Sequence, residues 1–145
     1  MNVEPDDVAH PDVVAELRTL RDHVDHVEGS VAASTDGMLI GYDLAETETY
    51  GVEPSAVAAL AAVNLGLGQR VTDTASYGEL QETLIRGAFG TVVTFSAGEH
   101  ALVAVLARRD IDLDRLRLAA RPVTARVAVL VADAREAATT AGFWP

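Results

Sequence analysis

Apolar positions follow the period of a helix at both ends of the chain and form an unbroken apolar segment in between. From residue 11 to residue 28, apolar side chains recur every three or four positions with charged residues between them. Pro11 suits the first turn of a helix, so the pattern predicts an amphipathic helix of about four turns that ends near Gly29. A last helix is predicted with Asp114 as its N-cap, and Pro122 inside it predicts a kink or an interrupted start.

Short apolar runs separated by turn residues predict five strands. The segment from Thr35 to Gly37 contains Asp-Gly and lies between two such runs, which favours a hairpin because Gly accepts the positive φ of the turn. A third run mixes polar and apolar residues, as an exposed edge strand does. The predicted strands are residues 30–34, 38–42, 79–85, 91–95 and 100–107. The element order is therefore α-β-β-α-β-β-β-α, and the last three strands form an antiparallel meander.

The segment from residue 56 to residue 68 is apolar on every side. It reads AVAALAAVNLGLG, follows Pro54 and holds one polar side chain, Asn64. A surface helix has a wet face, and this segment is too short to span a bilayer. Gly66 and Gly68 each cost about 1 kcal/mol in a helix interior, a cost tolerated where another backbone comes close. We expect one flank to be a self-association surface; the alternative is a helix buried within its own subunit.

Composition and charge narrow the classes of function. The chain of 145 residues suits one domain, and 49% of its residues are apolar, which indicates a folded core. Its net charge is −11 and all its basic residues are Arg, so it repels phosphate backbones and anionic membranes. It has no Cys, which excludes disulfides, thiolate nucleophiles and Cys-ligated zinc. With neither a signal peptide nor a membrane-spanning apolar stretch, we expect a cytoplasmic protein that binds no nucleic acid and inserts in no membrane.

No set of residues in the sequence forms a recognisable catalytic or metal site. The alternating Asp residues at 110–114 resemble the start of a calcium loop, but Arg occupies the sixth and twelfth positions, where the loop needs Gly and Glu. His23 and His26 have no third ligand at a suitable spacing. The glycines at 66–68 lack the preceding strand and third Gly of a dinucleotide loop, and no Ser lies in a G-x-S-x-G elbow. We expect no enzymatic activity and no cofactor.

In residues 27–40, VEGSVAASTDGMLI, a helix end, a strand, an Asp-Gly turn and a second strand follow one another. Through this segment and the order of its elements, the chain shows a resemblance to the dynein light chain-like Roadblock/LC7 domain family. The resemblance covers residues 12–132, and Pro122 departs from the family pattern. It implies an α/β (α+β) fold with a central five-stranded antiparallel sheet and helices packed on it, as in profilin. The expected domain is 11–135, between a disordered acidic segment at 1–10 and a C-terminal tail at 136–145.

The resemblance also implies a symmetric pair of chains with a protein partner. Family members pair through the second helix and the third strand, which extends the sheet across the dimer. The composition is similar to that of actinobacterial proteins, in which such modules accompany a sensor kinase and a Ras-like small GTPase. The implied function is a homodimeric regulatory adaptor for that GTPase. The arginines near element ends, candidates for contact with transferring phosphoryl groups, are Arg70, Arg86, Arg108 and Arg109. The expected interface residues are Val57, Leu60, Ala61, Asn64, Leu67, Gln81, Thr83 and Ile85.

Two other classes of function remain open. A small-molecule sensor with a profilin- or PAS-like sheet would need a concave pocket with convergent polar groups, so one face of its sheet would be hollow. An enzyme would need at least two ionisable groups that converge in a cleft, and the sequence offers no such set. Whether helices cover both faces of the sheet separates the sensor from the adaptor.

Overall fold

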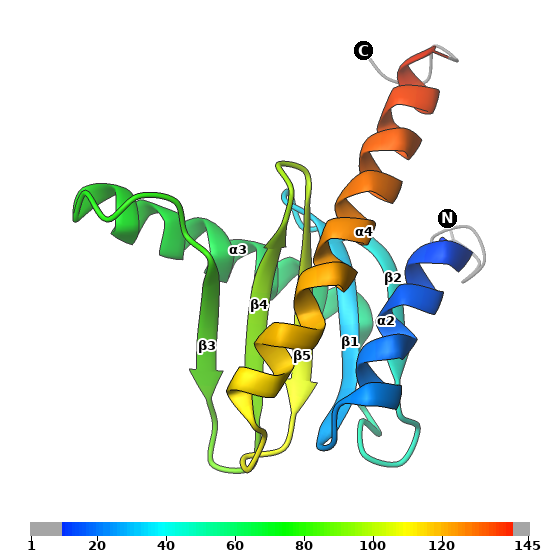
Figure 1. Cartoon of the computed structure of the whole chain (residues 1–145), viewed down its shortest axis with the longest axis vertical. Helices are drawn as coiled ribbons and strands as arrows, with labels where there is room; N and C mark the ends of the chain where they lie inside the picture. Colours follow the sequence, from blue (N-terminus) through cyan, green and yellow to red (C-terminus); the bar gives the residue numbers. More distant parts are fainter. Residues whose placement is uncertain (1–9, 141–145) are drawn as a thin grey trace.

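A single five-stranded antiparallel sheet organises residues 10–140, the part of the chain that this computed structural model describes (Figure 1). The strands are β1 (Val27–Ser34), β2 (Leu39–Leu44), β3 (Glu82–Arg86), β4 (Thr91–Ala97) and β5 (Ala101–Ala107). Their order across the sheet is β2-β1-β5-β4-β3, so the predicted fold class and element order are confirmed and β3 is an edge strand. Almost all of the predicted disordered lead, and Trp144 in the predicted tail, lie outside the described residues.

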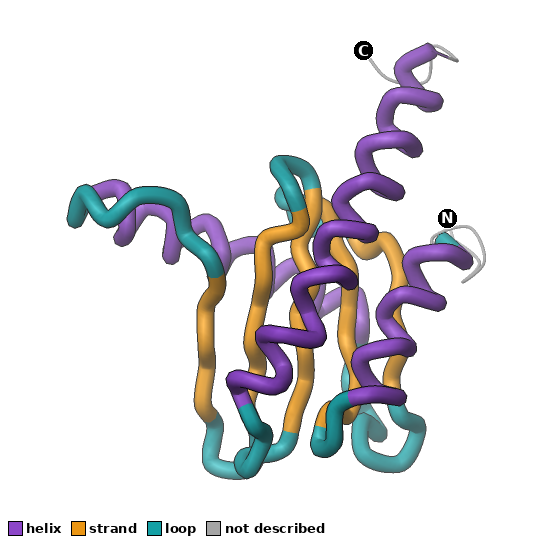
Figure 2. The backbone as a smooth tube through the Cα atoms, viewed as in Figure 1, coloured by secondary structure: helices purple, strands orange, loops and turns teal. Residues whose placement is uncertain are grey.

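Helices cover both faces of the sheet. Figure 2 shows α2 (Pro11–His23) and α4 (Leu113–Thr140) side by side in front of the strands, with α3 (Pro54–Thr74) behind them. The larger core lies under α2 and α4, where Leu17 and Leu116 are fully buried. The smaller core lies under α3 and is made largely of Ala and Leu. The sheet therefore has no hollow face of the kind that the sensor alternative requires.

An ion pair between a half-buried arginine and a buried carboxylate fixes α2 to the edge strand β2. The guanidinium of Arg21 donates from Nε and Nη2 to the two carboxylate oxygens of Asp43, each at 2.8 Å. The Asp43 side chain is 3% exposed, and its hydrogen bonds raise the pKa of Arg21. Arg18 approaches the same carboxylate at 3.6 Å, from a side chain that is 61% exposed. Asp43 thus has one close bidentate partner and one loose one.

The hairpin between β1 and β2 forms at the predicted Asp-Gly turn. Gly37 has a φ of 93°, which a side chain would strain, and its N–H donates to the Ser34 carbonyl. The Ser34 hydroxyl donates to the Asp36 carboxylate, which lowers the pKa of Asp36. The turn therefore follows from local chemistry that the sequence shows directly.

The first helix is shorter than its apolar spacing predicts. It ends at His23, and Val27 already belongs to β1, where it pairs with Ala107 of β5. His26 makes the sharp turn between the two elements with a φ of 73°. A positive φ is uncommon for a residue other than glycine, so the sequence does not indicate this turn. Val27, which the helical period placed in the first helix, is therefore part of the sheet, and the predicted helix end near Gly29 is wrong.

The boundaries of later elements also differ from prediction. The N-cap of α4 is Asp112, whose side chain accepts the N–H of Arg115, and not Asp114. The helix continues through Pro122 without interruption as far as Thr140, so the predicted domain boundary at residue 135 falls inside it. The predicted strand 79–85 begins only at Glu82, and α3 continues past the apolar segment to Thr74.

The ion pair under α2 yields a stability prediction. Arg21→Ala should lower the free energy of unfolding by about 2–3 kcal/mol, because it leaves the Asp43 carboxylate buried without its bidentate partner. Arg18→Ala, the matched control, should cost less than about 1 kcal/mol, because its contact is long and exposed. Urea denaturation monitored by circular dichroism measures both. Equal losses for the two variants would contradict the assignment of Arg21 as the main partner.

Candidate functional site

The large apolar side chains of α3 point away from the sheet. Ala58, Ala61, Ala62 and Leu65 face the strands and are buried. On the opposite side, four aliphatic side chains are 60–70% exposed: Leu60, Val63, Leu67 and Val71. Their spacing of three and four residues places them in one line, here called the outward row. A lone subunit that buried α3 for its own stability would turn these larger side chains inward. The outward row is therefore an exposed apolar surface of the kind at which protein contacts form.

The second half of α3 extends beyond the sheet. Figure 1 shows the helix crossing behind the strands and projecting past β3, with the chain then folding back to begin that strand. The burial pattern agrees, since no residue of α3 after Leu65 is buried. Part of the outward row, including Val71, therefore lies where this chain has no strand to support the helix. An additional strand beside β3 would lie in the space under this overhang.

The side chains of β3 alternate between the two faces of the sheet. Thr83 donates a hydrogen bond to the Asn64 side chain on α3, so Thr83 and Ile85 share the face of α3. Glu82 accepts from Arg117 of α4, at 2.8 Å from Nε and 2.9 Å from Nη2, so Glu82, Leu84 and Arg86 share the face of α4. Hydrogen bonding to Glu82 raises the pKa of Arg117. Each face of the edge strand is thus tied to a different helix.

The two glycines of α3 have different surroundings. A Cβ on Gly68 would lie 2.9 Å from Leu80 Cδ2 and 3.0 Å from Thr83 Cγ2, so this glycine lets the start of β3 pack closely on the helix. A Cβ on Gly66 would meet nothing within 4 Å. Gly66 is exposed beside the outward row. Contacts within the chain thus explain Gly68, whereas Gly66 leaves room for a close approach from outside.

The predicted interface residues divide between the surface and the interior. Leu60 and Leu67 lie in the outward row, and Ile85 is 49% exposed on the edge strand. Ala61 is 5% exposed and faces its own sheet, so it is not on the exposed flank. Of the remaining predicted residues, Val57 and Asn64 are partly buried, and Asn64 accepts the hydrogen bond from Thr83. Gln81 is exposed but precedes the strand.

Sequence reasoning missed Val63 and Val71 of the outward row. Because the segment is apolar on all sides, the hydrophobic period does not show which side faces the sheet. The signal was present in residue size: Ala is concentrated on the inner side, and Leu and Val alternate with it on the outer side. Leu84 and Arg86, exposed on the other face of β3, were also left out of the predicted interface.

The candidate metal and phosphate residues do not assemble into a site. Within residues 10–140, no group of three or more His, Asp or Glu side chains is placed to hold a metal ion. His23 Nδ1 lies 2.8 Å from the Thr19 carbonyl oxygen, whereas His26 Nε2 lies 3.7 Å from Asp110. Of the four candidate arginines, Arg70 lies on α3. Arg86 of β3 pairs with Thr91 of β4, which pairs with Ala107 of β5. Arg108 and Arg109 directly follow Ala107, so the three arginines other than Arg70 lie at one end of the sheet.

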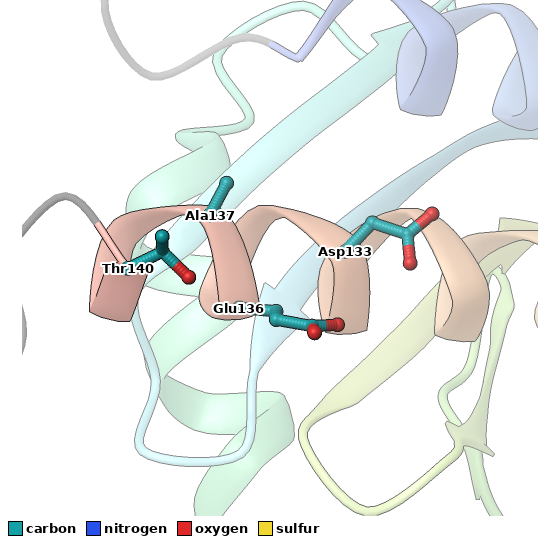
Figure 3. Close-up of a pocket in the computed structure, with 4 residues that line it drawn as sticks. All are labelled: Asp133, Glu136, Ala137 and Thr140. Atoms are coloured by element: carbon teal, nitrogen blue, oxygen red, sulfur yellow. The ribbon is translucent and has the colours of Figure 1, made fainter.

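The depressions on the surface are shallow. One of about 360 Å³ is lined by Arg70, Val71, Thr74 and Ala75 at the end of α3. Figure 3 shows another, of about 470 Å³, whose four lining residues all come from the last turns of α4: Asp133, Glu136, Ala137 and Thr140. A groove of about 200 Å³ between α4 and the β3–β4 edge is crossed by the Arg117–Glu82 pair. A single helix cannot enclose a ligand, so the first two are open surface.

The family model of the Roadblock/LC7 domain matches residues 13–107. This chain belongs to the Roadblock/LC7 domain family, as its sequence pattern predicts. An uncharacterized protein of Methanocaldococcus jannaschii is 29% identical over 92 residues, which span 63% of this chain and 76% of the relative.

Solved structures show the same fold. A Roadblock/LC7 domain from Streptomyces avermitilis matches with a TM-score of 0.73 at 20% identity, over 81% of this chain and 96% of that one. An MglB protein, solved in a tetrameric arrangement, matches with a TM-score of 0.77 at 18% identity, over 92% of this chain and 95% of the other. Among the described residues, no helix is both long and apolar enough to cross a membrane.

The orientation of α3 can be tested at two neighbouring positions. Ala61→Asp should abolish cooperative folding or lower the free energy of unfolding by about 3 kcal/mol or more, because it places an unpaired charge against the sheet. Val63→Asp, with the same charge on the outward row, should keep the native circular dichroism spectrum. If Val63→Asp unfolded the chain and Ala61→Asp did not, α3 would have the opposite orientation.

Proposed function

We propose that this protein is a cytoplasmic homodimeric adaptor that binds a Ras-like small GTPase in a signalling system and catalyses no reaction itself. The observation that carries the proposal is the outward row: four large aliphatic side chains in one line that residues 10–140 leave exposed. Removing apolar surface from water stabilises an association by about 25 cal/mol per Å² before its costs are counted, so such a row favours a protein contact over continued exposure.

A second copy of the chain is the occupant that fits this surface best. The outward row adjoins an unpaired strand, because α3 and β3 are joined by the Asn64–Thr83 hydrogen bond. A two-fold axis near β3 would cover the row and pair the strand at once, in a self-complementary contact. The tetrameric arrangement of the similar MglB supports self-association within this fold.

The GTPase is proposed from membership of the family, whose bacterial members the resemblance associates with Ras-like GTPases and, in actinobacteria, with a sensor kinase. The surface charge is compatible with a protein partner, because 22 acidic residues against 11 basic ones disfavour nucleic acid. Arg108 and Arg109 directly follow β5, at one end of the sheet and outside the strand that a second copy would pair. These two arginines stay accessible in the proposed dimer and supply positive charge for an acidic partner surface.

The proposed dimer predicts the effect of a charge in the outward row. Leu67→Glu should reduce the mass in solution from that of two chains to that of one, because it would bury an unpaired carboxylate between the copies. Leu118→Glu is the matched control, since Leu118 on α4 is 68% exposed against 60% for Leu67. Multi-angle light scattering measures the mass of both folded variants. A dimer that survives Leu67→Glu would reject this placement of the interface.

The proposed partner predicts selective capture. When the protein is immobilised, a small GTPase encoded beside its gene should be retained more strongly in the GTP-bound than in the GDP-bound form, because adaptors read the nucleotide-dependent switch segments. Preparations loaded with a non-hydrolysable GTP analogue or with GDP supply the comparison. Equal or absent retention for every neighbouring GTPase would contradict the adaptor function and leave the dimer unaffected.

A further inference from the structure

The first part of α4 carries positive charge in a chain that is acidic as a whole. Residues 113–131 contain four arginines and one aspartate, a net charge of +3, whereas the whole chain has −11. Salt screens exposed charges from one another beyond about 8–10 Å, so a partner that lies on α4 meets mainly the charge of this segment. An acidic partner would therefore be attracted to α4, although most of the chain would repel it.

An apolar row runs along the outer side of the same helix. Leu118 is 68% exposed and Val129 is 49% exposed. Pro122, Ala125 and Ala132 are exposed as well. Their spacing of three and four residues places these five side chains in one line of about 20 Å, here called the α4 row. The buried residues of α4 lie on the opposite side of the helix, so the α4 row faces away from the sheet.

Arginines border the α4 row on both sides. Toward α2, Arg126 Nε lies 3.9 Å from Glu16 Oε1, and Arg115 Nη2 donates to the His23 carbonyl at 3.4 Å. Toward β3, Arg121 lines the groove of about 200 Å³ between α4 and the β3–β4 edge. The Arg121 guanidinium is exposed and makes no hydrogen bond or ion pair within residues 10–140. The row thus has one unpaired cation on one border and two loosely held cations on the other.

From this arrangement we propose that α4 docks an amphipathic helix of a protein partner, with the apolar side of that helix on the α4 row and Asp or Glu on its flanks. Leu118 and Val129 would provide the apolar contact, and the small side chain of Ala125 between them would let the two helices approach closely. Carboxylates on the two flanks of the partner would face Arg121 on one border and Arg126 on the other.

Other occupants fit the α4 row less well. A second copy of the chain would bring a second segment of +3 against the first, so charge opposes self-association at this surface. A nucleic acid or an anionic membrane would extend beyond α4 and meet the negative charge of the rest of the chain. A helix of about five turns is long enough to cover the row and short enough to stay over the positive segment. Size, charge and apolar pattern therefore agree on one class of partner.

The α4 row and the outward row lie on opposite sides of the molecule. Figure 2 shows α4 in front of the strands and α3 behind them. A second copy that covers α3 and pairs with β3 would leave the α4 row open on each chain. This inference therefore goes beyond the proposed function, because the dimer uses α3 and β3 and the arginines offered to the GTPase follow β5.

A synthetic peptide tests the class of partner. The probe is a fluorescein-labelled amphipathic peptide of about eighteen residues, or five helical turns, with Leu along one side and Glu on both flanks. The matched peptide has Lys in place of Glu, which has a similar helix propensity. Fluorescence anisotropy with the full chain should show binding of the Glu peptide and binding of the Lys peptide that is weaker by about tenfold or more. Equal affinities, or no binding of the Glu peptide, would overturn the inference.

Substitutions on the two sides of the molecule test the position of the contact. Leu118→Glu and Arg121→Glu should each weaken binding of the Glu peptide by about tenfold or more, because both add negative charge where the carboxylates would lie. Leu67→Glu and Arg70→Glu make the same changes at exposed positions of α3 and should leave the affinity within about twofold, because distant sites act independently. Circular dichroism checks that all four variants are folded. Weaker binding by the α3 variants alone would overturn the placement on α4.

Two further measurements separate this inference from the proposed function. If vesicles of phosphatidylcholine and phosphatidylserine sediment the protein, and Leu118→Glu abolishes that binding, the α4 row is a lipid-binding surface. If light scattering gives Leu118→Glu a lower mass than the unmodified protein, the row is a contact between copies. Either result would overturn the docking of an acidic helix and leave the GTPase capture experiment unaffected.

Discussion

The packing of α3 on the sheet is the constraint on which the rest of this molecule depends. The buried residues of the helix are three alanines and one leucine, so it lies close to the sheet and buries little side-chain volume there. Its larger aliphatic residues form the outward row and remain uncovered. This distribution stabilises the subunit modestly and leaves apolar area available for association. Residues 10–140 therefore leave this apolar surface of the fold open to a partner.

The cores on the two faces of the sheet differ in size and in the helices that they support. On the side of α2 and α4, a core of large aliphatic residues and the Arg21–Asp43 pair hold the subunit together. On the side of α3, a smaller core carries the helix that overhangs the edge. The edge strand connects the two sides, because Thr83 bonds to α3 and Glu82 to α4. A partner strand at this edge would therefore lie beside residues that contact both layers.

Local signals in the sequence predicted the element order, the Asp-Gly hairpin and the edge strand, because turn residues and hydrophobic period act over a few positions. Boundaries decided by tertiary pairing were missed: Val27 has helical spacing, yet β5 draws it into the sheet. The uniformly apolar α3 carried no information about its orientation, so Ala61 was assigned to the wrong side while Val63 was overlooked. Which face of β3 meets which helix became clear only from the contacts of Thr83 and Glu82.

Amide hydrogen exchange of the unmodified protein, followed as a function of concentration, tests most directly whether a second copy covers this edge. Backbone amides at an unpaired strand edge exchange with solvent rapidly, and those in a ladder are protected. Because the N–H of Gly87 closes the β3–β4 turn and the pairs of a ladder alternate, the amides of Glu82, Leu84 and Arg86 point away from β4. They should be protected at high concentration and lose that protection on dilution, while those of β5 stay protected throughout. Fast exchange of the three edge amides at every concentration would show that no partner strand pairs there.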